Sequence, residues 1–206
     1  MHCSINNRWH QVFGLLALLT LAGCASGPTT PKAVETPAQS VVIPDDVARQ
    51  YNDAQTLLSV EDYAGAAIIL ESLTVAYPQY PAIGTSLAIC HRMLEDDGKA
   101  QATLESTLVA HPDYPPALNE VGILHRKSGE FAEAEAAYLK AVTVNPDYAL
   151  AHLNLGILLD LYLGRHQQAL EHYERYQQLV PDEDKQVARW ISDISRRLQR
   201  AAQVAR

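Results

Sequence analysis

The sequence predicts an all-α repeat protein, because two residue types recur at a fixed interval. Four prolines stand 34, 34 and 35 residues apart, and an alanine precedes each of them by twelve residues. These residues are Pro78, Pro112, Pro146 and Pro181, with Ala66, Ala100, Ala134 and Ala169. A period of this length, closed by a residue that stops helices, is typical of stacked helical hairpins. We therefore expect four hairpin units, at residues 47–80, 81–114, 115–148 and 149–183 within a domain that spans 45–183.

The spacing of apolar residues supports helices independently of the proline period. In 131–144 the apolar residues Phe131, Ala134, Tyr138 and Ala141 follow one another at intervals of three and four, which places them on one helical face. A single hairpin cannot cover such a face. Stacking against the next hairpin covers it.

The third unit, 115–148, has the fullest residue pattern. It has small residues where two helices would cross, a glycine at the turn, aromatic residues to fill the hairpin and a proline at the end, namely Gly122, Ala134, Gly129, Phe131, Tyr138 and Pro146. This pattern resembles the tetratricopeptide repeat, and the resemblance implies a right-handed superhelical solenoid that binds other proteins on its concave wall. The first and second units keep only part of the pattern. The fourth unit has one extra residue, within the sequence DLYLG, before its turn.

The resemblance also implies which side chains line the concave wall. Mapped onto the first helix of each unit, they are Tyr51, Gln55, Thr85, Ile89, Arg92, Asn119, Ile123, Arg126, Leu153 and Ile157. Arg92 and Arg126 are one repeat apart and can hold a carboxylate of an extended peptide, with the apolar residues holding its side chains. Alternatively, the two arginines are solvated and balance Glu95 and Glu130. The carboxylate clamp of chaperone-binding members is not expected, because Tyr51 and Gln55 stand where it has Lys and Asn.

Residues 184–206 break the period and predict a capping helix. Val187, Trp190, Ile191, Ile194 and Leu198 mark one face, which suits coverage of the open end of the fourth unit. Charge is uneven along the chain: residues 25–184 carry 9 basic and 23 acidic groups, whereas 185–206 carry 6 basic and 1 acidic group. The basic tail can contact anionic lipid or an acidic partner, and we also expect it to pair with the acidic solenoid beside it.

Residues 1–23 have the pattern of a secretory signal peptide. A short head with Arg8 precedes the apolar run 12–22, which is too short to cross a bilayer. The run ends in Leu-Ala-Gly-Cys24, which resembles the lipobox of bacterial lipoproteins. The resemblance implies removal of a signal peptide, 1–23, and acylation of Cys24, which anchors the protein to a membrane. Ala25 after the cysteine implies the outer membrane and a periplasm-facing protein, and the Pro-, Thr- and Ser-containing segment 24–44 predicts a flexible linker.

The sequence offers no pattern for catalysis, for a metal or for a cofactor. Phosphate loops, HExxH, GxSxG and paired-cysteine metal spacings do not occur. We expect Cys90 to be a buried, inert thiol, and His91 and His125 to be core or rim residues rather than metal ligands. His166 and His172 are expected to be solvated. A formal net charge of -8 argues against nucleic acid as a partner.

Together these observations predict a non-enzymatic scaffold or adaptor for a protein or peptide of the cell envelope. The resemblance leaves several roles open: a pilus or secretin assembly factor, an accessory lipoprotein of a TonB-type energy-transduction system, or an adaptor for a peptidoglycan hydrolase. A hydrolase that uses the histidines is the remaining enzymatic hypothesis. The sequence also leaves open whether the chain forms a homo-oligomer.

Overall fold

A computed structural model describes residues 43–204, and within this range the chain forms helices and no strands. The expected signal peptide, the acylated Cys24 and most of the linker lie outside the described residues. The helices are α1 (Asp45–Ser59), α2 (Tyr63–Ala76), α3 (Pro81–Met93), α4 (Asp97–Ala110), α5 (Pro115–Ser128), α6 (Phe131–Val144), α7 (Ala149–Ile157) with its continuation η1 (Leu158–Tyr162), α8 (His166–Leu179) and α9 (Lys185–Val204). None of these helices is both long and apolar enough to cross a lipid bilayer.

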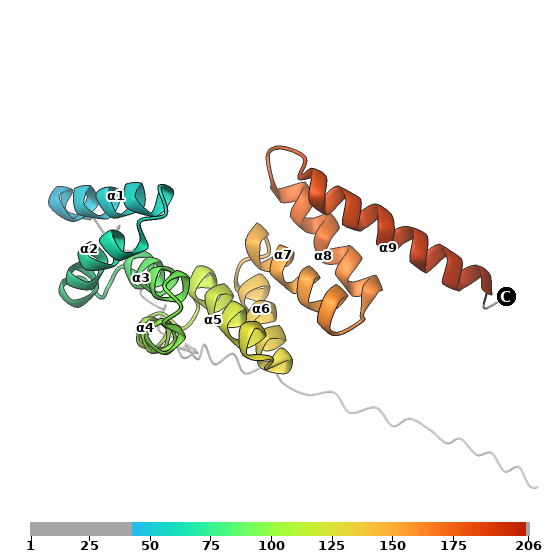
Figure 1. The fold of residues 1–206 in the computed structure, drawn as a ribbon, viewed down its shortest axis with the longest axis horizontal. Coiled ribbons are helices and arrows are strands. Elements are labelled where there is room, and N and C mark those ends of the chain that lie inside the picture. Colours follow the sequence, from blue (N-terminus) through green and yellow to red (C-terminus); the bar gives the residue numbers. More distant parts are fainter. Residues whose placement is uncertain (1–42, 205–206) are drawn as a thin grey trace, which may run out of the picture. The chain divides into compact units, whose positions relative to one another are not determined.

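The helices pair in chain order, as the all-α prediction requires. α1 packs on α2, α3 on α4, α5 on α6 and α7 on α8, and each hairpin packs on the one that follows it (Figure 1). The predicted solenoid of four hairpins followed by a C-terminal helix is confirmed. First helices also contact one another: α3 packs on α5 and α5 on α7, and α1 is joined to α3 by hydrogen bonds of Tyr51 and Gln55 to Ser86. α1, α3, α5 and α7 therefore form one wall of the stack.

In each hairpin a small buried residue on the first helix is combined with a large buried residue on the second helix, where the two helices cross. In the third and fourth hairpins a glycine faces a tyrosine: an added Cβ would lie 2.4 Å from Tyr138 at Gly122 and 2.7 Å from Tyr173 at Gly156. At the equivalent places the first and second hairpins have an alanine and a leucine, Ala54 with Leu70 and Ala88 with Leu104, all at most 1 % exposed. A larger residue on one helix thus accompanies a smaller one on the other, which keeps the core filled without overlap.

The turns inside the hairpins need a left-handed residue at the same repeat position. Gly129 and Gly164 have φ values of 80° and 64°, and Glu61 and Glu95 take the same conformation in the first two hairpins, with φ values of 60° and 62°. A residue with a Cβ pays for this conformation, whereas glycine does not. The first two turns are therefore more strained than the last two.

The extra residue of the fourth unit is accommodated by a π-helical turn at the end of α7. The Leu163 N–H donates to the Leu158 oxygen at 3.1 Å, five residues back, and the Arg165 N–H donates to the Leu159 oxygen at 2.8 Å, six residues back. A wider turn of this kind adds a residue without ending the helix. Leu158 and Leu159 remain buried in the core around Tyr173. The 35-residue interval in the sequence thus has a local structural cause.

α9 packs on α8 and covers the core of the fourth hairpin, as expected of a capping helix. Val187 and Ile194 are each 1 % exposed, and the Trp190 ring stacks at 5.4 Å from the Tyr173 ring. The expected pairing of the basic tail with the acidic solenoid is wrong for the described part of α9. Arg196 and Arg197 pair with Asp193 of the same helix, and α9 makes no ion pair with the other helices.

Candidate functional site

The ten residues predicted to line the concave wall all lie on α1, α3, α5 and α7, but they are not equally accessible. Thr85 and Asn119 are 4 % and 2 % exposed. The Thr85 hydroxyl donates to the Pro81 oxygen at 2.8 Å, and Asn119 accepts a hydrogen bond of 2.9 Å from the Asn154 amide. The Thr85 bond lies within α3 and the Asn119 bond joins α5 to α7, and both side chains are buried, so we do not include them in the surface offered to a partner.

The two predicted wall residues of α1 hold the first hairpin on the second. The Tyr51 hydroxyl lies 3.0 Å from the Ser86 hydroxyl, and the Gln55 amide donates to the same oxygen at 3.1 Å. Both side chains are half-buried. Ser86, which the sequence did not single out, is therefore the centre of the contact between α1 and α3.

The remaining apolar wall residues are half-buried. Ile123, Leu153 and Ile157 pack against the core cluster around Tyr138 and Tyr173. Ile89 is also half-buried, on α3. The wall thus presents partly covered aliphatic side chains between the arginines.

Arg92 is neutralised inside the protein. Its Nε donates to the Glu120 carboxylate of α5 at 2.9 Å, and Glu120 is only 8 % exposed. Burial raises the pKa of Glu120, while the Arg92 charge and hydrogen bond act in the opposite direction. The sequence hypothesis that Glu95 balances Arg92 is therefore wrong, because a carboxylate on the next hairpin has that role.

Arg126 has no carboxylate partner among the described residues. Its Nε donates to the Tyr138 hydroxyl at 3.4 Å, and its guanidinium carbon lies 5.9 Å from the centre of the Tyr162 ring. Glu130, the predicted balancing group, instead lies 2.6 Å from Nδ1 of His125. Burial disfavours the charge on Arg126, but the Tyr138 and Tyr162 hydroxyls more than offset it and the pKa of Arg126 is raised. A cation without a counter-charge thus lies on the wall.

Arg126 lies in a pocket of about 490 Å³ between the second, third and fourth hairpins. The pocket is lined by Arg92, Ile123, Arg126, Lys127, Gly129, Phe131 and Tyr162. The Phe131 and Tyr162 rings pack at 4.9 Å and form its aromatic side, and Lys127 is paired with Asp97 at 2.7 Å. With Arg92 and Lys127 both neutralised, the positive charge of the pocket comes from Arg126.

Tyr162 belongs to the pocket because of the π-helical turn. It is the last residue of η1 and is not among the ten wall residues predicted from the repeat register. The extra residue in DLYLG was the only indication in the sequence that this segment departs from the repeat. π-helical turns are common at functional sites.

Cys90 and His91 are buried in the protein. Cys90 is fully buried, and burial raises its pKa to about 11, which fits an inert thiol. His91 is also buried. In residues 43–204 no group of three or more His, Cys, Asp or Glu side chains is placed to hold a metal ion.

Two histidines that were expected to be solvated make contacts instead. His166 Nδ1 lies 3.1 Å from the Asp160 carboxylate, and His172 Nδ1 lies 3.0 Å from His152 Nδ1. His152 Nε2 lies 3.1 Å from the Pro146 oxygen, so Nε2 carries the proton of His152 and His172 donates to its Nδ1. Burial lowers the pKa of both rings of this pair.

The fold and the site define a helical-repeat solenoid with a small cationic pocket on its first-helix wall. Residues 119–184 match the tetratricopeptide repeat family, a family of generally non-catalytic scaffolds that bind proteins, and no enzyme family is indicated. No curated protein gives a significant match to the chain.

Solved structures share this fold. The pilF protein of Pseudomonas aeruginosa has a TM-score of 0.65 and 18 % identity, over 75 % of this chain and 69 % of its own. A thermophilic tetratricopeptide-repeat protein of Thermus thermophilus has a TM-score of 0.64 and 22 % identity, over 73 % and 82 %. MamA of Desulfovibrio magneticus has a TM-score of 0.53 and 20 % identity, over 65 % and 75 %. These similarities establish the solenoid fold.

Proposed function

We propose that this protein is a lipid-anchored adaptor of the cell envelope that binds an extended segment of another protein on the wall formed by α1, α3, α5 and α7. Arg126 is the observation that supports this proposal most directly. Its guanidinium is half-buried, has no carboxylate partner in the described chain and borders an open pocket of about 490 Å³. A partly desolvated guanidinium is a strong donor for a carboxylate.

The pocket favours a particular kind of segment. Ile123, Phe131 and Tyr162 offer apolar and aromatic contacts beside the guanidinium. The rest of the solenoid is acidic, so a segment with many acidic residues would be repelled. We therefore propose a single Asp or Glu flanked by apolar residues as the recognised element.

The anchor is proposed from the sequence of the leader. Leu21 to Cys24 fits a lipobox, and the linker to residue 44 would let the solenoid reach about 60 Å from the membrane if fully extended. With Ala25 after the cysteine, we propose the outer membrane and the periplasmic side. Labelling cells with an alkyne analogue of palmitate tests this: the wild-type protein takes up the label and Cys24→Ser does not, and a label that persists in Cys24→Ser would contradict the anchor.

Binding of a matched pair of peptides tests the pocket. One short peptide has a central Glu between Leu and Phe, and the other has Gln in its place. We expect the wild-type protein to bind the Glu peptide more tightly than the Gln peptide by roughly 10- to 100-fold in Kd, since a charged hydrogen bond contributes about 1.5–3 kcal/mol. Arg126→Gln should bind the two peptides equally.

Arg175→Gln is the control, because Arg175 is a cation of α8 that pairs with Asp147 and does not line the pocket. Equal affinity for the two peptides in the wild-type protein, or an equal loss in both variants, would refute the role of Arg126.

The roles left open by the sequence differ in the partner they require. Cross-linking in intact cells, followed by mass spectrometry, separates a pilus or secretin assembly factor, a TonB-type accessory protein and an adaptor for a peptidoglycan hydrolase by the protein captured. A hydrolase that uses His91 is not supported, because that ring is 6 % exposed.

A further inference from the structure

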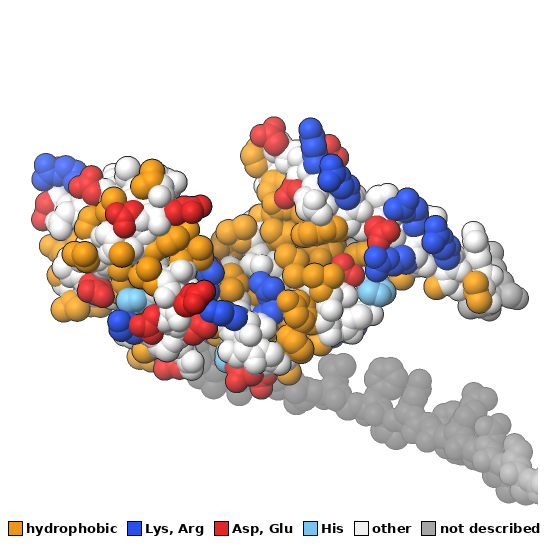
Figure 2. Space-filling view, viewed as in Figure 1, with side chains coloured by type: hydrophobic (Ala, Val, Ile, Leu, Met, Phe, Trp, Pro, Cys, Tyr) orange, Lys and Arg blue, Asp and Glu red, His pale blue; other side chains and the backbone are white. Residues whose placement is uncertain are grey.

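The outer face of α9 carries a stripe of positive charge. Lys185, Arg189, Arg196 and Arg200 follow one another at intervals of four, seven and four residues. At about 100° per residue these intervals place the four side chains within roughly 60° of one another around the helix, along roughly 23 Å of its length. All four side chains are exposed, and Lys and Arg atoms follow the outer edge of α9 in Figure 2. We call these four residues the cationic stripe.

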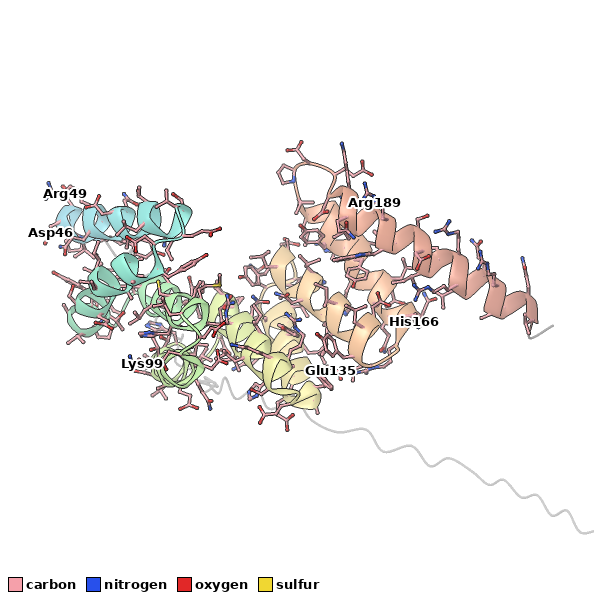
Figure 3. All side chains as sticks on the ribbon, in the orientation of Figure 1. Asp46, Arg49, Lys99, Glu135, His166 and Arg189 are labelled. Atoms are coloured by element: carbon pink, nitrogen blue, oxygen red, sulfur yellow. The ribbon has the colours of Figure 1, made fainter. Side chains whose placement is uncertain are left out.

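The cationic stripe lies opposite the face that holds α9 in place. Val187 and Ile194 are each 1 % exposed against α8, and their positions are about half a helical turn from the stripe. Packing therefore fixes the stripe toward solvent. Arg189 marks it near the start of the helix (Figure 3).

Within residues 43–204 the stripe makes no ion pair with another helix. Of its members only Arg196 makes an ion pair in the described chain, with Asp193 of the same helix at 3.3 Å. Elsewhere the protein uses cations to join neighbouring hairpins, as Lys127 does with Asp97 and Arg165 with Glu135. No cation of α9 makes such a link in the described chain.

The stripe also has a cost for folding. Lys185 with Arg189, and Arg196 with Arg200, are like charges four residues apart, an arrangement that destabilises a helix. Asp193, beside the stripe, offsets part of this repulsion, but it is the one acidic residue of α9 against five basic residues, so an excess of positive charge remains. A ligand that carries negative charge along a line would remove the cost.

We propose that the cationic stripe binds the anionic headgroups of a phospholipid bilayer. A membrane surface fits better than a protein because large apolar or aromatic side chains, the usual anchors of protein interfaces, are absent from the exposed part of α9 before Val204. The rest of the chain, residues 25–184, carries 23 acidic and 9 basic groups and is repelled by the same surface. α9 is therefore the side that approaches the membrane. The proposal does not depend on acylation or on the peptide-binding wall.

Vesicle sedimentation tests the proposal on the chain from residue 25, which contains every described helix and lacks the acyl anchor. We expect binding to vesicles that contain phosphatidylglycerol and little binding to pure phosphatidylcholine. The variant R189Q/R196Q/R200Q should lower the partition coefficient by roughly a hundredfold, because each basic residue near an anionic surface contributes about fivefold. Salt at about 1 M, where screening acts within ~3 Å, should abolish the binding.

A matched control removes the same charge from other places. Arg49 and Lys99, on α1 and α4 in Figure 3, and Lys140 of α6 are also exposed cations. The variant R49Q/K99Q/K140Q should bind vesicles as well as the wild-type protein or better. Equal loss in the two triple variants would show a net-charge effect and overturn the assignment to α9.

A positional probe separates a bound α9 from a bound solenoid. Ser192 is exposed beside the stripe and Ser72 is exposed on α2, and Cys90 is buried, so an environment-sensitive dye reacts selectively with Ser192→Cys or Ser72→Cys. We expect a blue shift with anionic vesicles only for the dye at 192. A shift at 72 instead, or no binding of the wild-type protein to anionic vesicles, would overturn the proposal, and the second result would leave an acidic protein as the occupant.

Discussion

The crossing of α5 and α6 allows a quantitative test of how the hairpins are packed. A Cβ added at Gly122 would lie 2.4, 2.6 and 2.8 Å from three atoms of the Tyr138 ring, and ordinary contacts begin near 3.4 Å. The ring is fully buried, and its hydroxyl accepts a hydrogen bond from Arg126, so it has little freedom to move. Gly122→Ala therefore costs about 1–3 kcal/mol of overpacking, of which a gain of ~1 kcal/mol in helix propensity recovers part.

The other hairpins suggest a compensating change. Ala88 and Leu104 occupy the equivalent positions of the second hairpin and belong to one core cluster, so the double variant Gly122→Ala/Tyr138→Leu recreates a pair that this fold already uses. Tyr138→Leu alone leaves unfilled space and costs about 2–3 kcal/mol. The added methyl group fills part of that space, so we expect the double variant to be more stable than the sum of the single variants by about 0.5–3 kcal/mol.

Urea and thermal unfolding followed by circular dichroism measure these differences. With a net cost of about 1 kcal/mol, Gly122→Ala should lower Tm by roughly 2–4 °C for a domain of this size. Gly98→Ala is the control, because a Cβ there meets only one atom, at 3.9 Å, and the change should be neutral or stabilising. If the double variant loses as much stability as the two single variants added together, the matched-pair explanation of the crossings is refuted.

Two further predictions concern the histidine pair and the strained turns. Burial lowers the pKa of His152 and of His172 from 6.5. The neutral pair therefore stabilises the fold above pH 6.5, and that stability is lost as pH falls through the lower folded pKa values. Urea unfolding at pH 7.5 and at about pH 5 should show a smaller loss of unfolding free energy in His172→Leu than in the wild-type protein, and an equal loss would contradict the role of the pair. Glu95→Gly should raise stability by about 1 kcal/mol because the residue has a φ of 62°, whereas Glu105→Gly inside α4 should lower it by a similar amount. A loss of stability in Glu95→Gly would show that the turn is not strained.

The hairpins could be predicted from the sequence because their causes are local. Pro146 stops α6, Gly129 takes the left-handed turn and Gly122 accommodates a tyrosine on the facing helix, and each residue type is required where it stands. The 34-residue period then predicted the first two hairpins, in which fewer of these residue types are present. A repeat pattern predicts those features that all the repeats share.

The chemistry of the site could not be predicted in the same way. Arg92 pairs with Glu120, 28 residues away, and the contact depends on how two hairpins stack. Tyr162 reaches Arg126 because a π-helical turn adds a residue at the end of α7. Both features break the repeat, so a pattern averaged over repeats does not contain them.

The order of packing in the stack has a mechanical consequence. α1 is held by α2 and by the hydrogen bonds of Tyr51 and Gln55 to Ser86, while the Arg126 pocket lies two hairpins further along. A pulling force applied between the chain before α1 and a load at the pocket acts along the first two hairpins and leaves α8 and α9 unstressed. We therefore expect the first hairpin, with its strained turn at Glu61, to unfold before the others under such a force. The distance between the two points of attachment would then increase while the pocket stays folded.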